Sequence, residues 1–161
     1  MIELKLSETT YKLPANWNDV SFKKYCGIVQ AKGKDLIERL AVYSGVPRET
    51  LDKISLNQLN YISGTVEFMD FPETIEAFSI AYESDMVIGD EMYWRVENAK
   101  QEIQKNKDNP ILAGVEIIKA FTADKDGNGG EDISDTPVTE VIGRVAFFLR
   151  SCQSFGSGSK G

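Results

Sequence analysis

Apolar residues recur at intervals of three and four positions along most of this chain, the spacing that gathers them on one face of an α-helix. Clear alternation of apolar and polar residues is confined to the start of the chain. There Ile2, Leu4 and Leu6 alternate with charged residues, and the pattern resumes at Tyr11 and Leu13. Such alternation predicts a short β-hairpin with one buried face. We therefore expect a mainly α-helical α+β fold with a small sheet at its N-terminal end.

Several segments are predicted to be helical, and capping residues mark some of their ends. Gly45 stands where a left-handed C-terminal cap is expected, and Ser55 and Gln58 match a capping box. The helical segments span residues 21–33, 34–44, 47–54, 55–66, 91–105, 110–121 and 137–149. The first is expected to bury Phe22, Tyr25, Cys26 and Val29, and the fourth Leu56, Leu59, Ile62 and Val66.

The middle of the chain changes character, because β-branched and aromatic residues become frequent there. This composition allows a second small hairpin, Ala77 to Tyr82 against Met86 to Ile88. No linker separates two apolar-rich halves, so we expect a single α-rich domain over residues 1–153. Residues 154–161, with the sequence SFGSGSKG, have the composition of a flexible C-terminal tail.

The 161 residues include no histidine, which removes several kinds of active site. Ser-His-Asp and Cys-His catalysis both need an imidazole, as do many zinc sites. The two cysteines, Cys26 and Cys152, are far apart and form no Cys-x-x-Cys pair, so a thioredoxin-type site is excluded by spacing. No acid, base and nucleophile can be assembled from the remaining residues. We therefore expect a non-enzymatic protein with no catalytic residues and no resident cofactor.

The chain is acidic, with 25 Asp and Glu against 18 Lys and Arg. A net charge of −7 disfavours nucleic acid, since affinity for the phosphate backbone comes mainly from neutralising cations. The same charge disfavours an anionic membrane surface. No secretion signal is recognisable, and the longest apolar run is Val145 to Leu149, far short of a membrane span. We expect neither nucleic acid nor membrane as a partner.

One acidic, glycine-rich loop carries metal-ligand spacing. It begins at Asp124 and ends at Asp135, and it resembles the loop of a calmodulin-type EF-hand. The candidate calcium ligands are Asp124, Asp126, Asn128, Gly130, Asp132 and Asp135. Glu131 departs from the pattern at position eight, where the family has an aliphatic residue, and Asp135 replaces the usual glutamate at position twelve. The competing interpretation is a solvated connection between two helices, which supplies four of the seven net negative charges.

Phe147 is the second singular residue. It lies opposite the apolar stripe that runs from Val138 to Val145, so it is expected to point away from the core. Together with Phe155 it marks a candidate partner-binding face. An isolated apolar residue on a surface is common, so an unremarkable surface position is the alternative.

Three stretches resemble small morphogenesis proteins of tailed bacteriophages. The first is YKLPANWNDVSFKKY at residues 11–25, where a strand ending in Leu-Pro precedes a Trp, an acidic residue and a helix. The second runs from Leu36 to Pro47 and continues into Leu56-Asn-Gln-Leu59. The third leads from Thr136-Pro-Val138 to FFLRS at residues 147–151.

This resemblance implies a non-enzymatic role in building or joining the phage tail or neck. A tail assembly chaperone and a structural ring or connector component both fit it. The implied partners are other phage structural proteins or further copies of the same chain. The implied location is the host cell cytoplasm during assembly, or the virion. The alternative is a small calcium-binding protein that uses the loop at 124–135.

Overall fold

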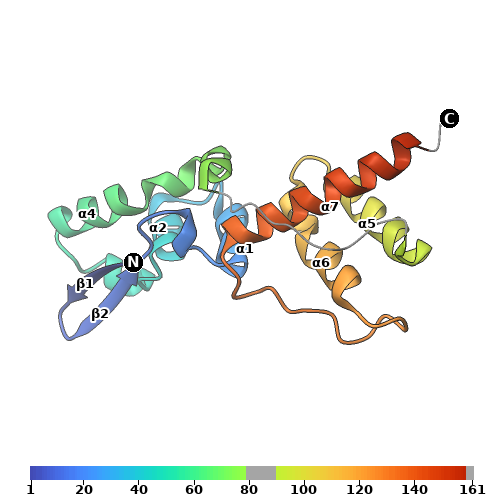
Figure 1. Cartoon of the computed structure of the whole chain (residues 1–161). Coiled ribbons are helices and arrows are strands. Elements are labelled where there is room, and N and C mark those ends of the chain that lie inside the picture. Colours follow the sequence, from blue (N-terminus) through green and yellow to red (C-terminus); the bar gives the residue numbers. More distant parts are fainter. Residues whose placement is uncertain (79–89, 159–161) are drawn as a thin grey trace. The chain divides into compact units, whose positions relative to one another are not determined.

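The computed structural model describes residues 1–78 and 90–158 (Figure 1). Its contacts divide the chain into two compact units, Met1–Phe78 and Ser79–Gly161. The mainly helical α+β fold with an N-terminal hairpin is confirmed. Most of the second predicted hairpin lies outside the described residues, and its first two residues, Ala77 and Phe78, end a 3-10 helix.

Unit 1 begins with the predicted hairpin, in which β1 (Ile2–Leu6) pairs with antiparallel β2 (Thr9–Leu13). The register places Ile2 opposite Leu13 and Leu4 opposite Tyr11, so their side chains share one face of the sheet. Leu6 and Leu13 are buried, and Ile2, Leu4 and Tyr11 are half-buried. The hairpin therefore covers part of the helical core of this unit.

The helices of unit 1 follow in close succession. They are α1 (Phe22–Ala31), α2 (Leu36–Ser44), α3 (Arg48–Leu51) and α4 (Leu56–Val66), with 3-10 helices η1 (Trp17–Asp19), η2 (Glu67–Asp70) and η3 (Pro72–Phe78). Two predicted caps are confirmed. Gly45 adopts φ 76° at the end of α2, and Ser55 and Gln58 form the capping box of α4.

Trp17 is the centre of the core of unit 1. Its side chain is fully buried, and its Nε1 donates a hydrogen bond to Thr74 Oγ1 at 2.8 Å. The ring meets Tyr25 and Phe68 edge-on, with centroid distances of 6.3 and 5.1 Å. Contacts from one indole thus hold together η1, α1, η2 and η3.

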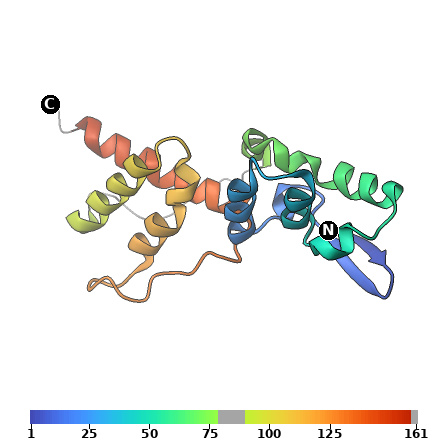
Figure 2. The same cartoon turned by 180° about the vertical axis from the view of Figure 1, so that it is seen from behind.

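Unit 2 contains α5 (Tyr93–Lys105), η5 (Pro110–Ala113), α6 (Gly114–Thr122) and α7 (Val138–Gly158). Helix α6 packs against both α5 and α7, and Figure 2 shows the three helices of this unit together. The rings of Phe121 and Phe148 stack at 4.8 Å, and Val138, Val141 and Val145 are buried on the same side of α7. Helix α7 continues through residue 158, so five residues of the segment expected as a tail are helical here.

None of the described helices combines the length and the hydropathy that a membrane span requires.

Candidate functional site

In the predicted calcium loop, Asp124 and Asp132 accept hydrogen bonds from neighbouring groups of the loop itself. Asp124 Oδ1 accepts from the backbone N–H groups of Asp126 and Asn128, each at 2.9 Å. Asp132 Oδ1 accepts from the N–H of Ser134 at 3.0 Å and from its hydroxyl at 2.7 Å. The whole loop is described, and neither there nor elsewhere in the described chain do three His, Cys, Asp or Glu side chains gather as metal ligands would.

Glu131, the residue that departs from the EF-hand pattern, forms a two-pronged ion pair with Arg144. The guanidinium donates from Nη1 at 3.0 Å and from Nη2 at 2.7 Å to the two carboxylate oxygens. The Arg144 side chain is only 7% exposed, whereas that of Glu131 is 44% exposed. The hydrogen bonds from Arg144 lower the pKa of the Glu131 carboxyl below its ordinary value of 4.5.

Arg95 anchors the other end of the loop. Its Nη2 donates to the backbone carbonyls of Ala123 at 2.5 Å and of Asp124 at 2.6 Å, and its Nη1 lies 3.4 Å from Glu91. The residue is buried, so these bonds satisfy carbonyls at the C-terminal end of α6. Arg95 and Arg144 together clamp the loop, which the sequence pattern had not suggested.

The loop also closes tightly on α6. A Cβ atom placed on Gly130 would lie 2.6 Å from the carbonyl oxygen of Lys119, too close for any residue larger than glycine without a backbone shift. The N–H of Glu131 donates to Thr122 Oγ1 at 2.8 Å. The loop between α6 and α7 is therefore a fixed connection whose polar groups are largely used within unit 2.

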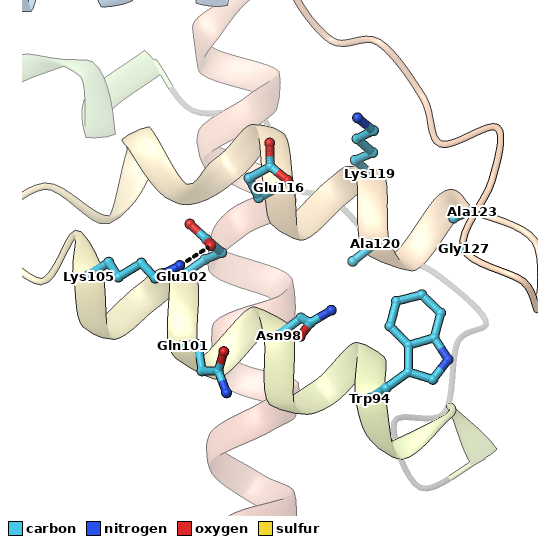
Figure 3. Close-up of a pocket in the computed structure, with 10 residues that line it drawn as sticks. All are labelled: Trp94, Asn98, Gln101, Glu102, Lys105, Glu116, Lys119, Ala120, Ala123 and Gly127. Atoms are coloured by element: carbon cyan, nitrogen blue, oxygen red, sulfur yellow. Dashed lines mark hydrogen bonds and ion pairs between the residues drawn. The ribbon is translucent and has the colours of Figure 1, made fainter.

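A polar groove runs between α5 and α6 (Figure 3). Its cavity has a volume of about 330 Å³, near the lower end of the range for small-ligand sites. Trp94 stands at one end beside Gly127, and the ion pair of Glu102 with Lys105, 2.9 Å long, lies at the other. Asn98 lies between them, so the groove offers an indole and an amide flanked by charges of both signs. This composition favours neither an anion nor a cation.

The predicted partner residues Phe147 and Phe155 both fall on α7. Phe147 is half-buried, and its ring meets Phe148 edge-on at a centroid distance of 5.5 Å. It is therefore not fully turned toward solvent, because the neighbouring aromatic ring covers part of it. The side chain of Phe155 lies outside what the structure describes, so its pairing with Phe147 stays a prediction.

Large exposed apolar side chains on the described helices include Leu56 and Tyr61 on α4, Leu36 on α2 and Tyr93, 78% exposed, on α5. Leu56 is 71% exposed and Tyr61 is 50% exposed, while Ile62 and Val66 form the buried side. The prediction that Leu56 belongs to the buried face is wrong, because the face that meets α2 is centred on Ile62 and Val66 and the first turn extends beyond it.

Charge is absent from this helix. Within the described parts of the chain, α4 is the α-helix without a single Asp, Glu, Lys or Arg. The uncharged run extends from Ile54 to Val66, in a sequence of which 27% is charged. This uncharged run is visible in the sequence and is the signal that could have predicted the exposed face of α4. That face consists of Leu56, Asn57, Asn60, Tyr61 and Gly64.

The loop, the groove and the α4 face therefore differ in which groups they leave free to contact another molecule. The loop uses its polar groups internally, the groove is polar with balanced charge, and the face of α4 is uncharged and exposed. No family model, curated protein or solved structure matches this chain.

Proposed function

We propose that this chain is a non-enzymatic interaction module in the assembly of a bacteriophage tail or neck. In that role it binds other structural proteins or further copies of itself, in the host cytoplasm during assembly or within the virion. The observation that carries the interaction role is the exposed, uncharged face of α4.

The composition of this face is that of the centre of a protein interface. Such centres are depleted of charged residues and enriched in tyrosine relative to the rest of a protein surface. A surface helix ordinarily turns charged residues to water, yet α4 exposes Leu56 and Tyr61 among amides and small residues. Covering an exposed leucine side chain removes apolar area from water and contributes about 1.5–3 kcal/mol when burial is complete.

The tail or neck assignment is supported by the resemblance to phage morphogenesis proteins. Its second stretch ends at Leu56-Asn-Gln-Leu59, which is the first turn of α4. The resembling sequence thus reaches the exposed face, and an assembly partner is a natural occupant for a surface that lacks charge.

The test uses the phage that encodes this chain. Deleting the gene is expected to stop tail assembly, and Tyr61→Glu, which places a charge on the α4 face, is expected to reduce it strongly. Lys107→Gln lowers the net charge by the same single unit at an exposed position in a turn and is expected to leave assembly intact. Mass spectrometry of purified particles then separates a retained structural component from a chaperone that is absent at maturity. Normal tails in the deletion strain would contradict the proposal.

A further inference from the structure

Asn128 precedes Gly129 in the loop between α6 and α7, and this is the only Asn-Gly pair in the chain. Asparagine is a chemically labile residue, because the backbone nitrogen that follows it is able to attack its side-chain amide. A following glycine favours this attack, since it has no Cβ atom to obstruct the approach. Both residues of the pair are exposed. Whether the pair reacts therefore depends on how the fold holds its two reacting groups.

Neither reacting group is restrained by a hydrogen bond. The nucleophile is the backbone nitrogen of Gly129, whose N–H meets no hydrogen-bond acceptor among the described residues. The electrophile is the side-chain amide of Asn128, which also forms no hydrogen bond with any residue that the structure describes. A Cβ atom placed on Gly129 would meet nothing within 4 Å, so the peptide group between the two residues has room to turn.

The neighbouring Asp126-Gly127 pair is held more firmly. An aspartate before a glycine is able to form the same cyclic product by losing water. Here, however, the N–H of Gly127 donates to the carbonyl oxygen of Asp124 at 3.0 Å. A Cβ atom on Gly127 would also lie 3.6 Å from the indole of Trp94, so the residue is confined on that side. The loop thus restrains the first glycine and leaves the second accessible.

We propose that Asn128 is a site of spontaneous deamidation, a self-modification in which water is the co-reactant. The nitrogen of Gly129 attacks Cγ of Asn128, the new N–Cγ bond closes a succinimide ring, and the Cγ–Nδ2 bond breaks. The amide nitrogen leaves as ammonia and takes up the proton that Gly129 loses. Water then opens the ring. Opening at Cγ gives aspartate, and opening at the backbone carbonyl gives isoaspartate, with no oxidant or reductant required.

Isoaspartate changes the backbone at a point where the loop is pinned. In the unmodified chain the N–H of Asn128 donates to Asp124 Oδ1, and its carbonyl accepts from the N–H of Asp124, each at 2.9 Å. In isoaspartate the chain continues through the former side chain, so one methylene is added before Gly129 and the former carbonyl becomes a carboxylate. The bond from the Asp124 N–H then re-forms to a displaced acceptor or breaks.

The loop has little room for the added length. Before Asn128, the carbonyl of Asp124 accepts a hydrogen bond from Arg95 at 2.6 Å. After it, Gly130 lies so close to the carbonyl of Lys119 that even a Cβ atom does not fit. We therefore expect isoaspartate to displace Gly130 and to weaken the hydrogen bond that the next N–H, that of Glu131, donates to α6.

Peptide mapping of the folded, full-length chain tests the site. The protein is incubated in mildly alkaline buffer below its melting temperature, and isoaspartate is detected with an isoaspartyl methyltransferase. Asn128 is expected to lose its amide faster than every other asparagine, at a rate close to that of a synthetic peptide covering residues 124–132. Asn128→Gln is the matched control. Its longer side chain has to close a larger ring, so it is expected to show far less modification at this position.

Hydrogen exchange tests the effect on the loop. The isoaspartate form is separated by ion exchange, and exchange of the Glu131 amide hydrogen is compared with that in the unmodified chain. Asn128→Asp carries the new carboxylate on a normal backbone, so it is the control for charge. The isoaspartate form is expected to lose protection at Glu131, whereas Asn128→Asp is expected to retain it.

Two results would overturn the site. One is a folded chain in which Asn128 loses its amide no faster than the other asparagines, and the other is isoaspartate at Asp126 in place of Asn128. Equal protection of Glu131 in the isoaspartate form and in Asn128→Asp would overturn the effect on the loop. The site is independent of the proposed assembly role, so its failure would leave that role standing.

Discussion

The loop at 124–135 and helix α4 differ most in their charge and in how far their side chains are free to contact another molecule. The loop holds five acidic residues, yet its start is bound by Arg95 and its Glu131 by Arg144. Helix α4 holds no charge, yet it presents Leu56 and Tyr61 to solvent. The comparison shows that a motif that is conspicuous in the sequence is not for that reason free to bind a ligand in the folded chain. A carboxylate that already forms an ion pair within the fold is less able to bind a ligand than an exposed, uncharged helix face is to bind a partner.

The largest effect is expected when the loop loses its clamp. Arg144→Met removes a buried guanidinium from Glu131, and we expect the free energy of unfolding to fall by about 2–3 kcal/mol. The figure is below that for a fully buried pair because Glu131 is partly exposed and water screens the remaining carboxylate. Urea unfolding measures the change. A loss below about 0.5 kcal/mol would mean that Arg144 does not hold the loop.

The same glycine-to-alanine change is expected to have opposite signs in the two regions. Gly130→Ala drives a methyl group against the Lys119 carbonyl, and we expect a loss of about 1–2 kcal/mol. Gly64→Ala adds a methyl group in open space within a helix, and we expect a gain of about 0.5–1 kcal/mol. Urea unfolding at low micromolar concentration compares them, each variant serving as the control for the other. Equal changes would show that the loop does not press on α6.

These two regions also show which features were readable from the sequence. The caps of α2 and α4 were predicted correctly because Gly45, Ser55 and Gln58 act on neighbouring backbone groups. The arginine contacts were missed because they join residues 13 and 28 positions apart. A signal existed for Arg144, which borders the apolar stripe of α7, because a guanidinium buried there needs hydrogen-bond acceptors.

The choice of buried face was less readable than the presence of a helix. The first helix was expected to bury Cys26 and Val29, but it turns Ile28 and Ala31 fully inward and leaves those two half-buried. Periodicity gives the width of an apolar stripe, whereas distant packing decides which part of it meets the core. Here the packing is that of Trp17 against Tyr25 and Phe68.

A smaller effect is expected from pH. Because Arg144 lowers the pKa of Glu131, the pair contributes stability above the ordinary value of 4.5 and loses it as the pH falls through the lowered pKa. Glu131→Gln removes this group from the titration, so the stability difference between the two proteins should shrink below pH 4.5. Unfolding followed across this range measures it. A difference that stays constant down to acid pH would contradict the pairing.

The smallest effect is expected from calcium. Glu131 is held by Arg144 and Asp132 bonds to Ser134, so we expect millimolar calcium to leave the melting temperature unchanged. A one-site rise in melting temperature that disappears in Asp124→Ala would instead support the calcium-binding interpretation and reverse the comparison of the two regions.

The contact of Gly130 with the last turn of α6 affects how readily proteases cleave the chain. A glycine-rich surface loop is ordinarily a preferred place for nicking. Here a protease gains access only after the loop lifts from α6 and the bonds of Glu131 to Arg144 and Thr122 break together. Cleavage at this loop is therefore governed by how often that opening occurs, and the loop acts as a latch on unit 2.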